Sequence, residues 1–438
     1  METTQKPLEK LNIFSFKGVQ MRTFHLTWMA FFLCFFGWFG LAPLMTIIKK
    51  DLGLSKEQIG NIIIASVAAT VVARILIGKL CDSWGPRKTY AALMGVCSIP
   101  VMSVGLVHSY EAFLLFRLAI GVIGASFVIT QYHTSVMFDQ KIVGTANAVA
   151  GGWGNLGGGI TNMVMPLVFG FFISMGYLPE SAWRVAMIIP GVFLFIFAFV
   201  YYRFTKDTPA GNFEDLAIAN PKAVKTKGAL AKAAKDPRTW ALFLAYGACF
   251  GIEITFDNVA ALYFFENYET SLATAGILAG TFGFMNIFAR AIGGILADKV
   301  GNKYGMVGKG RLLATLLCLE GIGIALFAQS GSLTMAVVTM LGFAMFLKMA
   351  NGVTYAIVPF INRKAIGSVS GIVGAGGNVG AVLAGFLFKS SSISYSEAFM
   401  YIGGAIACIA AVVALVNFEK TQNIMAERLS PSAEAVGS

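Results

Sequence analysis

Long apolar segments recur twelve times along this chain, and each is long enough to cross a lipid bilayer as a helix. A hydrocarbon core about 30 Å thick is crossed by about 20 helical residues. Charged residues make up only 13% of the chain, whereas a typical soluble domain carries roughly 25%. The segments lie near residues 26–48, 59–80, 89–107, 111–137, 143–175, 183–202, 239–265, 272–297, 312–329, 332–360, 366–389 and 397–417. Because lipid offers no hydrogen-bond partner to open backbone groups, the sequence predicts an all-α polytopic membrane protein.

Basic residues gather in one set of the connections between these segments. They account for the net charge of +11, which is therefore not a signal for nucleic-acid binding. They are Arg87, Lys88, Lys206, Lys222, Lys225, Lys227, Lys232, Lys235, Arg238, Lys299, Lys303, Lys309, Arg311, Arg363 and Lys364. Since cytoplasmic loops carry an excess of lysine and arginine, we expect both termini in the cytoplasm and the chain in the cytoplasmic membrane. The pair Lys49 and Lys50, on the opposite side, is the exception.

A polar, lysine-rich stretch divides the chain into two related halves. It runs over 203–238 and separates one six-segment half, 1–202, from another, 239–438. Four residues recur 216 positions later: Arg74, Gly78, Asp82 and Gly85 match Arg290, Gly294, Asp298 and Gly301. The glycine-rich runs "GGWGNLGGG" and "GAGGNVGAVLAG" repeat at an offset of 223, which pairs Asn155 with Asn378. This six-plus-six parallel repeat resembles the major facilitator transporters, whose twelve-helix fold we therefore expect.

Two short motifs resemble signatures of the same superfamily. The stretch "GKLCDSWGPRK", from Gly78 to Lys88, resembles the signature between the second and third helices. The stretch "RLAIGVIG", from Arg117 to Gly124, resembles the fourth-helix signature. Neither indicates a substrate. We expect Asp82 and Arg87 to act in gating, by pairing with neighbouring helix ends on the cytoplasmic side.

Two arginines lie inside apolar segments, where a charge is costly and normally faces a cavity or a partner. Arg74 and Arg290 occupy equivalent places in the two halves, and neither has an acidic residue three or four positions away. Two facing guanidinium groups repel unless an anion lies between them, and their paired N–H donors suit a planar oxyanion. The pattern predicts a central anion site. The alternative is a pair of structural arginines that reach the membrane interface.

The glycine-rich runs allow two interpretations. Small residues spaced along one helix face are typical of close helix packing. They also let a helix backbone approach a substrate, and on this interpretation Gly154 and Gly377 border the binding site. Asn155 and Asn378 lie at the centres of the runs, where a side-chain amide could donate a hydrogen bond to an anion.

The same runs resemble the paired signature motifs of the nitrate/nitrite porter family. The stretch "FGIEITFDNVAALYFFENY", residues 250–268, is similar to the seventh helix of plant, algal and cyanobacterial high-affinity nitrate transporters. The resemblance covers nearly the whole chain. It implies a secondary active transporter that imports nitrate or nitrite through a central site for a small planar anion.

Residues carried over by this resemblance define that site. Arg74 and Arg290 would clamp the anion, and Asn155 belongs to the first signature motif. Phe127 corresponds to an aromatic residue that sandwiches the substrate, and Tyr246 and Phe250 to an aromatic wall from the seventh helix. Ordinary helix packing is the alternative for these aromatic residues, in a chain with 37 phenylalanines.

The sequence leaves more than one candidate for the energy source that drives transport. The chain has no phosphate-binding G-x-x-x-x-G-K-[ST] loop, so we do not expect it to hydrolyse ATP itself. We expect a transporter rather than an enzyme, monomeric, with no cofactor and no metal. Glu253 and Asp257 lie one turn apart in the seventh segment, and acidic groups inside a span suit proton carriers. We therefore expect proton symport. Nitrate/nitrite antiport is the alternative, in which a carboxyl simply pairs with Lys348, and a non-transporting nitrate sensor is a more distant one.

Overall fold

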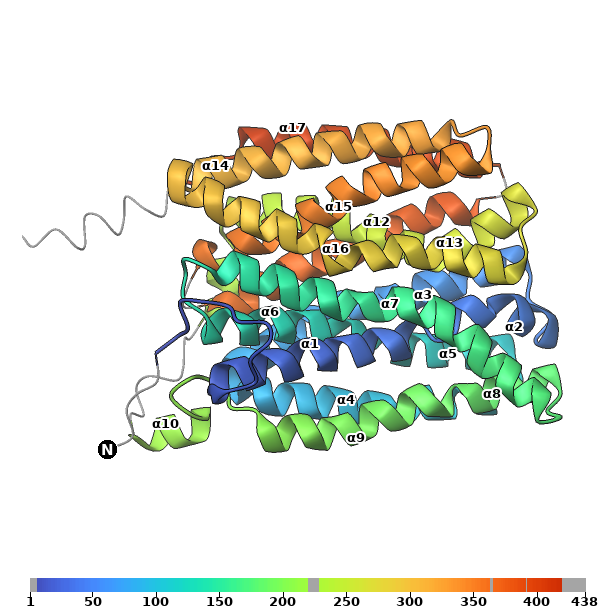
Figure 1. The fold of residues 1–438 in the computed structure, drawn as a ribbon, viewed down its shortest axis with the longest axis horizontal. Coiled ribbons are helices and arrows are strands. Elements are labelled where there is room, and N and C mark those ends of the chain that lie inside the picture. The colour runs from blue at the N-terminus through green and yellow to red at the C-terminus, as the bar shows by residue number, and fades with distance from the viewer. Residues whose placement is uncertain (1–5, 220–227, 363–364, 391, 420–438) are drawn as a thin grey trace, which may run out of the picture.

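The computed structural model describes residues 6–219, 228–362, 365–390 and 392–419, and these ranges are almost entirely helical. Within them, eleven helical stretches are long and apolar enough to cross a membrane. One of these, Thr274–Ala328, has 55 residues, about 80 Å as a straight helix and too long for one crossing. The chain turns back at Gly305 (φ 64°, ψ −159°), a backbone conformation that favours glycine, so this stretch makes two crossings. The twelve predicted spans are therefore all helical (Figure 1).

The helices that precede the central connection end at Phe204. They are α1 (Gly18–Phe39), η1 (Ala42–Leu44), α2 (Met45–Asp51), α3 (Lys56–Trp84), α4 (Pro86–Ser103), η2 (Val104–Leu106), α5 (Tyr110–Gly121), η3 (Val122–Ala125), α6 (Ser126–Met137), α7 (Val143–Ser174), α8 (Pro179–Ala186) and α9 (Ile188–Phe204). The connection itself carries two short helices, α10 (Phe213–Ala219) and α11 (Ala229–Ala234). Lys222, Lys225 and Lys227 lie outside the described residues, as do Arg363 and Lys364.

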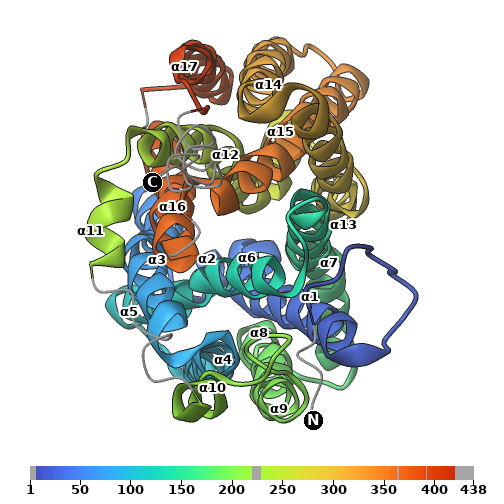
Figure 2. The same ribbon diagram turned by 90° about the vertical axis from the view of Figure 1, so that its left-hand side faces the viewer.

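The remaining helices follow from Pro237 onward. They are α12 (Pro237–Tyr268), α13 (Leu272–Phe284), η4 (Met285–Ile287), α14 (Ala289–Ala328), α15 (Leu333–Ile361), α16 (Ile366–Lys389) and α17 (Tyr395–Leu415). Figure 2 looks along the bundle and shows α12 to α17 on one side and α1 to α9 on the other. Helix α16 packs against α3, and α14 packs against α7, so the seam between the two groups runs through the middle of the molecule.

Two equivalent contacts close this seam at the end of the bundle where α9 ends, which we call the linker end. A β-carbon on Gly78 would lie 2.5 Å from the Gly367 carbonyl oxygen, and one on Gly294 would lie 2.7 Å from the Gly144 carbonyl oxygen. Both separations are too short for a real β-carbon, so the backbones meet here only because the residues are glycine.

Next to each glycine contact, an aspartate accepts hydrogen bonds from the opposite group of helices. Asp82 accepts from Ser368 Oγ at 2.9 Å. Asp298 accepts from the Thr145 backbone N–H at 2.7 Å and from its Oγ1 at 2.8 Å. Thr145 and Ser368 stand at the repeat offset of the glycine runs, so the two closures are related by the internal duplication.

Arg87, the second predicted gating residue, contacts its own half instead. Its backbone N–H donates to Asp207 Oδ1 at 2.9 Å, and its guanidinium lies 4.3 Å from the ring centre of Tyr202. Burial raises the pKa of Asp207, while the hydrogen bonds from Arg87 and Phe213 act in the opposite direction. Asp82 therefore joins the two groups of helices, and Arg87 ties α4 to the start of the central connection.

Candidate anion-binding site

The two repeat-related arginines meet at the centre of the seam. Arg74 from α3 is 0% exposed and Arg290 from α14 is 1% exposed. The guanidinium carbon of Arg74 lies 5.5 Å from the ring centre of Phe127 and 4.9 Å from that of Phe250. The guanidinium carbon of Arg290 lies 5.2 Å and 5.7 Å from the same two rings. Two cations from opposite halves thus share one pair of aromatic rings.

Each arginine keeps a buried guanidinium nitrogen without a partner. Arg74 donates through Nε to the Gly124 carbonyl at 3.1 Å and through Nη1 to the Gly374 carbonyl. Arg290 donates through Nη2 to the Tyr246 hydroxyl at 3.2 Å. Neither forms an ion pair with a carboxylate in the part of the chain described, and Arg74 Nη2 and Arg290 Nη1 have no hydrogen-bond partner. A buried, unpaired donor is costly, and a small oxyanion would satisfy both.

The three predicted aromatic residues form a stack beside the arginines. The rings of Phe127 and Phe250 lie 5.4 Å apart at 20°, and those of Phe127 and Tyr246 lie 5.5 Å apart at 16°. Tyr246 and Phe250 stack at 4.7 Å and 9°. The structure therefore brings together Phe127 of α6 and the α12 pair that the sequence placed in one site.

Tyr355 of α15 completes the cluster, and the sequence analysis missed it. Its ring stands edge-on to Phe127 at 4.6 Å and to Tyr246 at 4.9 Å, and its hydroxyl donates to the Ser370 carbonyl at 3.2 Å. A signal was present in the internal repeat. The stretch "GASF" ends in Phe127 and the stretch "GVTY" ends in Tyr355, 228 positions later.

Helix α1 contributes two further aromatic residues, Phe31 and Phe35, of which the sequence analysis missed Phe31. Phe31 packs on Phe127 at 5.4 Å, and Phe35 packs on Phe250 at 6.4 Å. Phe31 and Phe35 stand 215 positions before Tyr246 and Phe250, so α1 and α12 contribute equivalent pairs. The aromatic cluster therefore follows the same twofold repeat as the arginines it surrounds.

The two asparagines of the glycine runs make contacts that differ from those expected. Asn155 donates through Nδ2 to Glu253 Oε1 at 3.3 Å, and Asn378 donates to the Val67 carbonyl at 3.1 Å. In both residues the amide oxygen is buried without a partner. Both amides therefore donate to acceptors of the protein itself, and a hydrogen bond from either to an anion stays a prediction.

Gly154 and Gly377 lie directly against the aromatic cluster. A β-carbon on Gly377 would lie 2.7 Å from Phe250 Cδ1 and 2.9 Å from Tyr246 Cδ1. One on Gly154 would lie 2.5 Å from Phe31 Cγ. The absence of a side chain at these two glycines therefore lets three rings of the cluster approach the helix backbone closely.

We expect the substitution Gly377→Ala to weaken anion binding at the two arginines. The added methyl group displaces the rings of Phe250 and Tyr246, and overpacking of this kind costs roughly 1–3 kcal/mol. The measurement is the anion affinity of the purified variant beside Gly404→Ala, a helical glycine in α17 whose β-carbon would meet nothing within 4 Å. Unchanged affinity in Gly377→Ala would show that the rings need not hold this position.

The two carboxyl groups predicted to carry protons, Glu253 and Asp257 of α12, differ sharply in their surroundings. Glu253 accepts from Lys348 Nζ at 2.9 Å and from the amides of Asn286 at 2.7 Å and Asn351 at 2.6 Å, in addition to Asn155. All of these side chains are buried. Glu253 is therefore the centre of a fully buried ion pair with three supporting amides.

Asp257 lacks such support. It is 4% exposed, and its Oδ1 has no hydrogen-bond partner. Its Oδ2 lies 3.5 Å from where a β-carbon of Gly158 would stand, which places the carboxyl against α7. Glu320 of α14 is also completely buried, and neither of its oxygens has a hydrogen-bond partner. Of the two predicted proton carriers, only Asp257 forms no ion pair within the described part of the chain.

Comparisons with known proteins agree with this architecture. A family model described as "Major Facilitator Superfamily" matches residues 27–347. The proton:xylose symporter XylE superposes with a TM-score of 0.66 at 14% identity, covering 91% of this chain and 94% of that one. The chain therefore belongs to the Major Facilitator Superfamily, whose members are membrane transporters, and it is a multi-pass membrane protein.

Sequence relatives place the chain more closely. "High affinity nitrate transporter 2.5" of Arabidopsis thaliana is 41% identical over 401 residues, which cover 90% of this chain and 80% of the relative. "Nitrate transporter 2.1" of Chlamydomonas reinhardtii is 39% identical and covers 89% and 73%. "Nitrate/nitrite transporter NrtP" of Picosynechococcus sp. is 30% identical and covers 84% and 85%. Within the superfamily, the chain belongs to the nitrate/nitrite porter family.

Proposed function

We propose that this protein is a secondary active transporter that imports nitrate or nitrite across the cytoplasmic membrane. The observation that carries the proposal is the pair of buried arginines, each with an unpartnered guanidinium nitrogen, beside the same two stacked rings. A planar anion suits both features, because guanidinium groups bind its oxygens in the plane and aromatic rings pack on its flat faces. The names of the relatives support nitrate and nitrite as the anions.

The proposal includes alternating access by a monomer. In it, the linker end and both termini face the cytoplasm, and the halves 1–202 and 239–438 rock about the central site while 203–238 connects them. The glycine contacts and the two aspartates at the linker end support a closure that can part, since they join the halves through few side chains. Arg74 and Arg290 stand on opposite sides of this seam, so movement of the halves changes their separation.

For the energy source we propose proton symport, with Asp257 as the proton-carrying group. An unpaired carboxyl inside a membrane helix is costly as an ion, which favours uptake of a proton. The membrane potential opposes anion entry by about 2.3 kcal/mol per charge per 100 mV, so uptake needs more than one proton per nitrate. Nitrate/nitrite exchange is the second candidate, and the ion pair of Glu253 with Lys348 favours it, because one predicted carrier is already neutralised.

Transport by the purified protein in proteoliposomes tests both nitrate transport and its coupling to protons. Nitrate counterflow without a gradient tests transport itself, and accumulation driven by an imposed pH gradient tests symport. Absence of both activities in the wild-type protein would refute nitrate transport. Counterflow without pH-driven accumulation would favour exchange.

We expect the substitution Asp257→Asn to separate these two activities. Counterflow should persist, because the arginines are untouched, whereas pH-driven accumulation should fall to the background level, because the amide cannot take up a proton. Glu266→Gln is the matched control, since Glu266 lies exposed near the end of the same helix. Full pH-driven accumulation by Asp257→Asn would exclude this residue from the proton path.

A further inference from the structure

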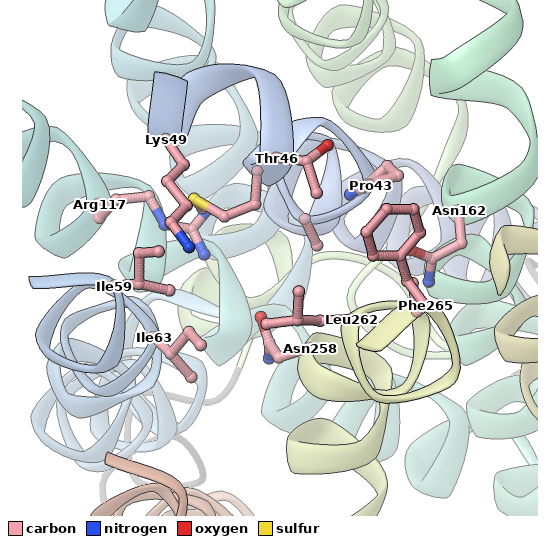
Figure 3. Close-up of a pocket in the computed structure, with 13 residues that line it drawn as sticks. Pro43, Thr46, Lys49, Ile59, Ile63, Arg117, Asn162, Asn258, Leu262 and Phe265 are labelled. Carbon is pink, nitrogen blue, oxygen red and sulfur yellow. The ribbon is translucent and has the colours of Figure 1, made fainter. Parts of the chain in front are cut away.

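A second cavity lies on the far side of the arginine site from the linker end. Its volume is about 50 Å³, and it is partly open to solvent. Its walls come from α2, the beginning of α3, α5, α7 and the second half of α12 (Figure 3). None of the thirteen residues that line it is acidic, and two of them, Lys49 and Arg117, are cations.

The two cations face one another across one side of this cavity. Figure 3 shows the side chains of Lys49 and Arg117 pointing toward one another. Arg117 is 1% exposed; it donates through Nη1 to the Trp38 carbonyl at 3.3 Å, and its Nε has no partner. Lys49 is exposed and forms no ion pair with any residue that the structure describes. The cavity thus holds two positive charges and no counterion from its own walls.

The neutral polar residues of the cavity, Thr46, Asn162 and Asn258, bring no charge to its walls. Asn162 donates one amide N–H to the Gly158 carbonyl at 3.2 Å, and Asn258 donates one to the Ile254 carbonyl at 2.8 Å. One N–H of each amide is therefore bonded to its own helix. The charged donors of the cavity are the lysine ammonium and the arginine guanidinium.

The cavity lies along the same path as the arginine site. Arg117 precedes Phe127 by ten residues of nearly continuous helix, which corresponds to about 15 Å. Aromatic contacts connect the two places: Phe35 packs on Phe250 at 6.4 Å and on Trp38 at 5.3 Å, and the Trp38 carbonyl accepts from Arg117. An anion held at the cavity is thus two to three helical turns from the central site.

We propose that Lys49 and Arg117 form an outer site that collects a small monovalent anion, of the nitrate or nitrite class, before it reaches Arg74 and Arg290. The inference rests on the proposed transport function and adds to it a recruitment step. A cleft lined by one sign of charge raises the local concentration of its ligand and the rate of association by 10- to 1,000-fold. This role accounts for the position of Lys49, which departs from the distribution of basic residues elsewhere in the chain.

A charge-exchange experiment at Lys49 tests the outer site. Initial rates of nitrate uptake are measured in right-side-out vesicles at low ionic strength, with the variant Lys49→Cys before and after treatment with membrane-impermeant thiol reagents. One reagent attaches a trimethylammonium group and the other a sulfonate. We expect Lys49→Cys to raise KM about threefold or more with an unchanged maximal rate, because one of two attracting charges is lost. The ammonium should restore KM, and the sulfonate should raise it further.

Three comparisons make the result decisive. Lys50→Cys is the matched control, since Lys50 is the exposed neighbour that does not line the cavity, and its KM should not respond to either reagent. Arg117→Gln should raise KM in the same way, and Arg117→Lys should raise it less. Equal effects of the two reagents on Lys49→Cys, or no effect of either, would overturn the outer site. Failure of the untreated wild-type protein to take up nitrate would instead overturn the transport function.

Discussion

Replacement of either Arg74 or Arg290 by lysine is expected to weaken nitrate binding at least 30-fold, which corresponds to about 2 kcal/mol. Lysine keeps the positive charge but presents a compact ammonium in place of a planar fork, so it cannot offer two parallel, coplanar N–H donors to one anion. The substitution also removes existing hydrogen bonds. Arg290→Lys removes the donor to the Tyr246 hydroxyl, and Arg74→Lys removes the donors to the Gly124 and Gly374 carbonyls.

Nitrate affinity of the purified variants, measured by calorimetry, checks this prediction. Arg311→Lys is the control, because it makes the same arginine-to-lysine change at an exposed residue of α14 near the linker end of the bundle. A thermal melt in the same detergent shows whether each variant is folded. A folded variant at Arg74 or Arg290 that binds nitrate as tightly as the wild type would refute the clamp.

The substitution Glu253→Gln is expected to lower the free energy of unfolding by about 3–5 kcal/mol. It leaves the Lys348 ammonium buried without a counterion, although the three amides around the site remain. The double variant Glu253→Gln/Lys348→Met should recover most of the loss, since replacing a buried ion pair as a whole is often nearly neutral.

Unfolding in detergent, followed by circular dichroism, measures these effects. The matched control is Glu320→Gln, which changes a carboxyl that is equally buried but has no hydrogen bond to lose, so we expect it to melt like the wild type. The structural role of Glu253 is contradicted if Glu253→Gln melts like the wild type and loses only pH-driven accumulation. That outcome would return Glu253 to the proton path.

The membrane helices could be predicted from the sequence because the physics that fixes them is local. A helix that crosses lipid must satisfy its own backbone and present apolar side chains, so its position is visible in a window of about 20 residues. The exact position of the turn between the eighth and ninth spans was harder to predict. The sequence shows only a short basic connection there, whereas the structure reverses the chain at Gly305 within one continuous helical stretch.

The meeting of Arg74 and Arg290 could also be predicted, because it follows from symmetry. Equivalent residues of two halves that face one another across an axis must approach each other at that axis. The same symmetry relates Phe127 in the fourth span to Tyr355 in the tenth, so it also predicts that Tyr355 lies at the site. Duplication thus conveys long-range information that a single helix does not.

The partners of individual polar groups could not be predicted in this way. The hydrogen bond from Asn155 to Glu253 was not among the contacts expected from the sequence. The choice depends on the rotation of α7 against α12 by a fraction of a turn, which is set by packing over the whole helix. Asn286 and Asn351, which complete the surroundings of Glu253, are neutral residues in apolar segments, and nothing in their local sequence marks them.

The glycine contacts at the linker end also bear on how fast such a protein can work. Backbone contacts of this kind contribute roughly 0.5–1 kcal/mol each, and water can replace the hydrogen bonds to Asp82 and Asp298 once the seam parts. If the halves rock as proposed, the two equivalent contacts at Gly78 and Gly294 part in the same step. We therefore expect this end of the bundle to govern turnover number rather than affinity.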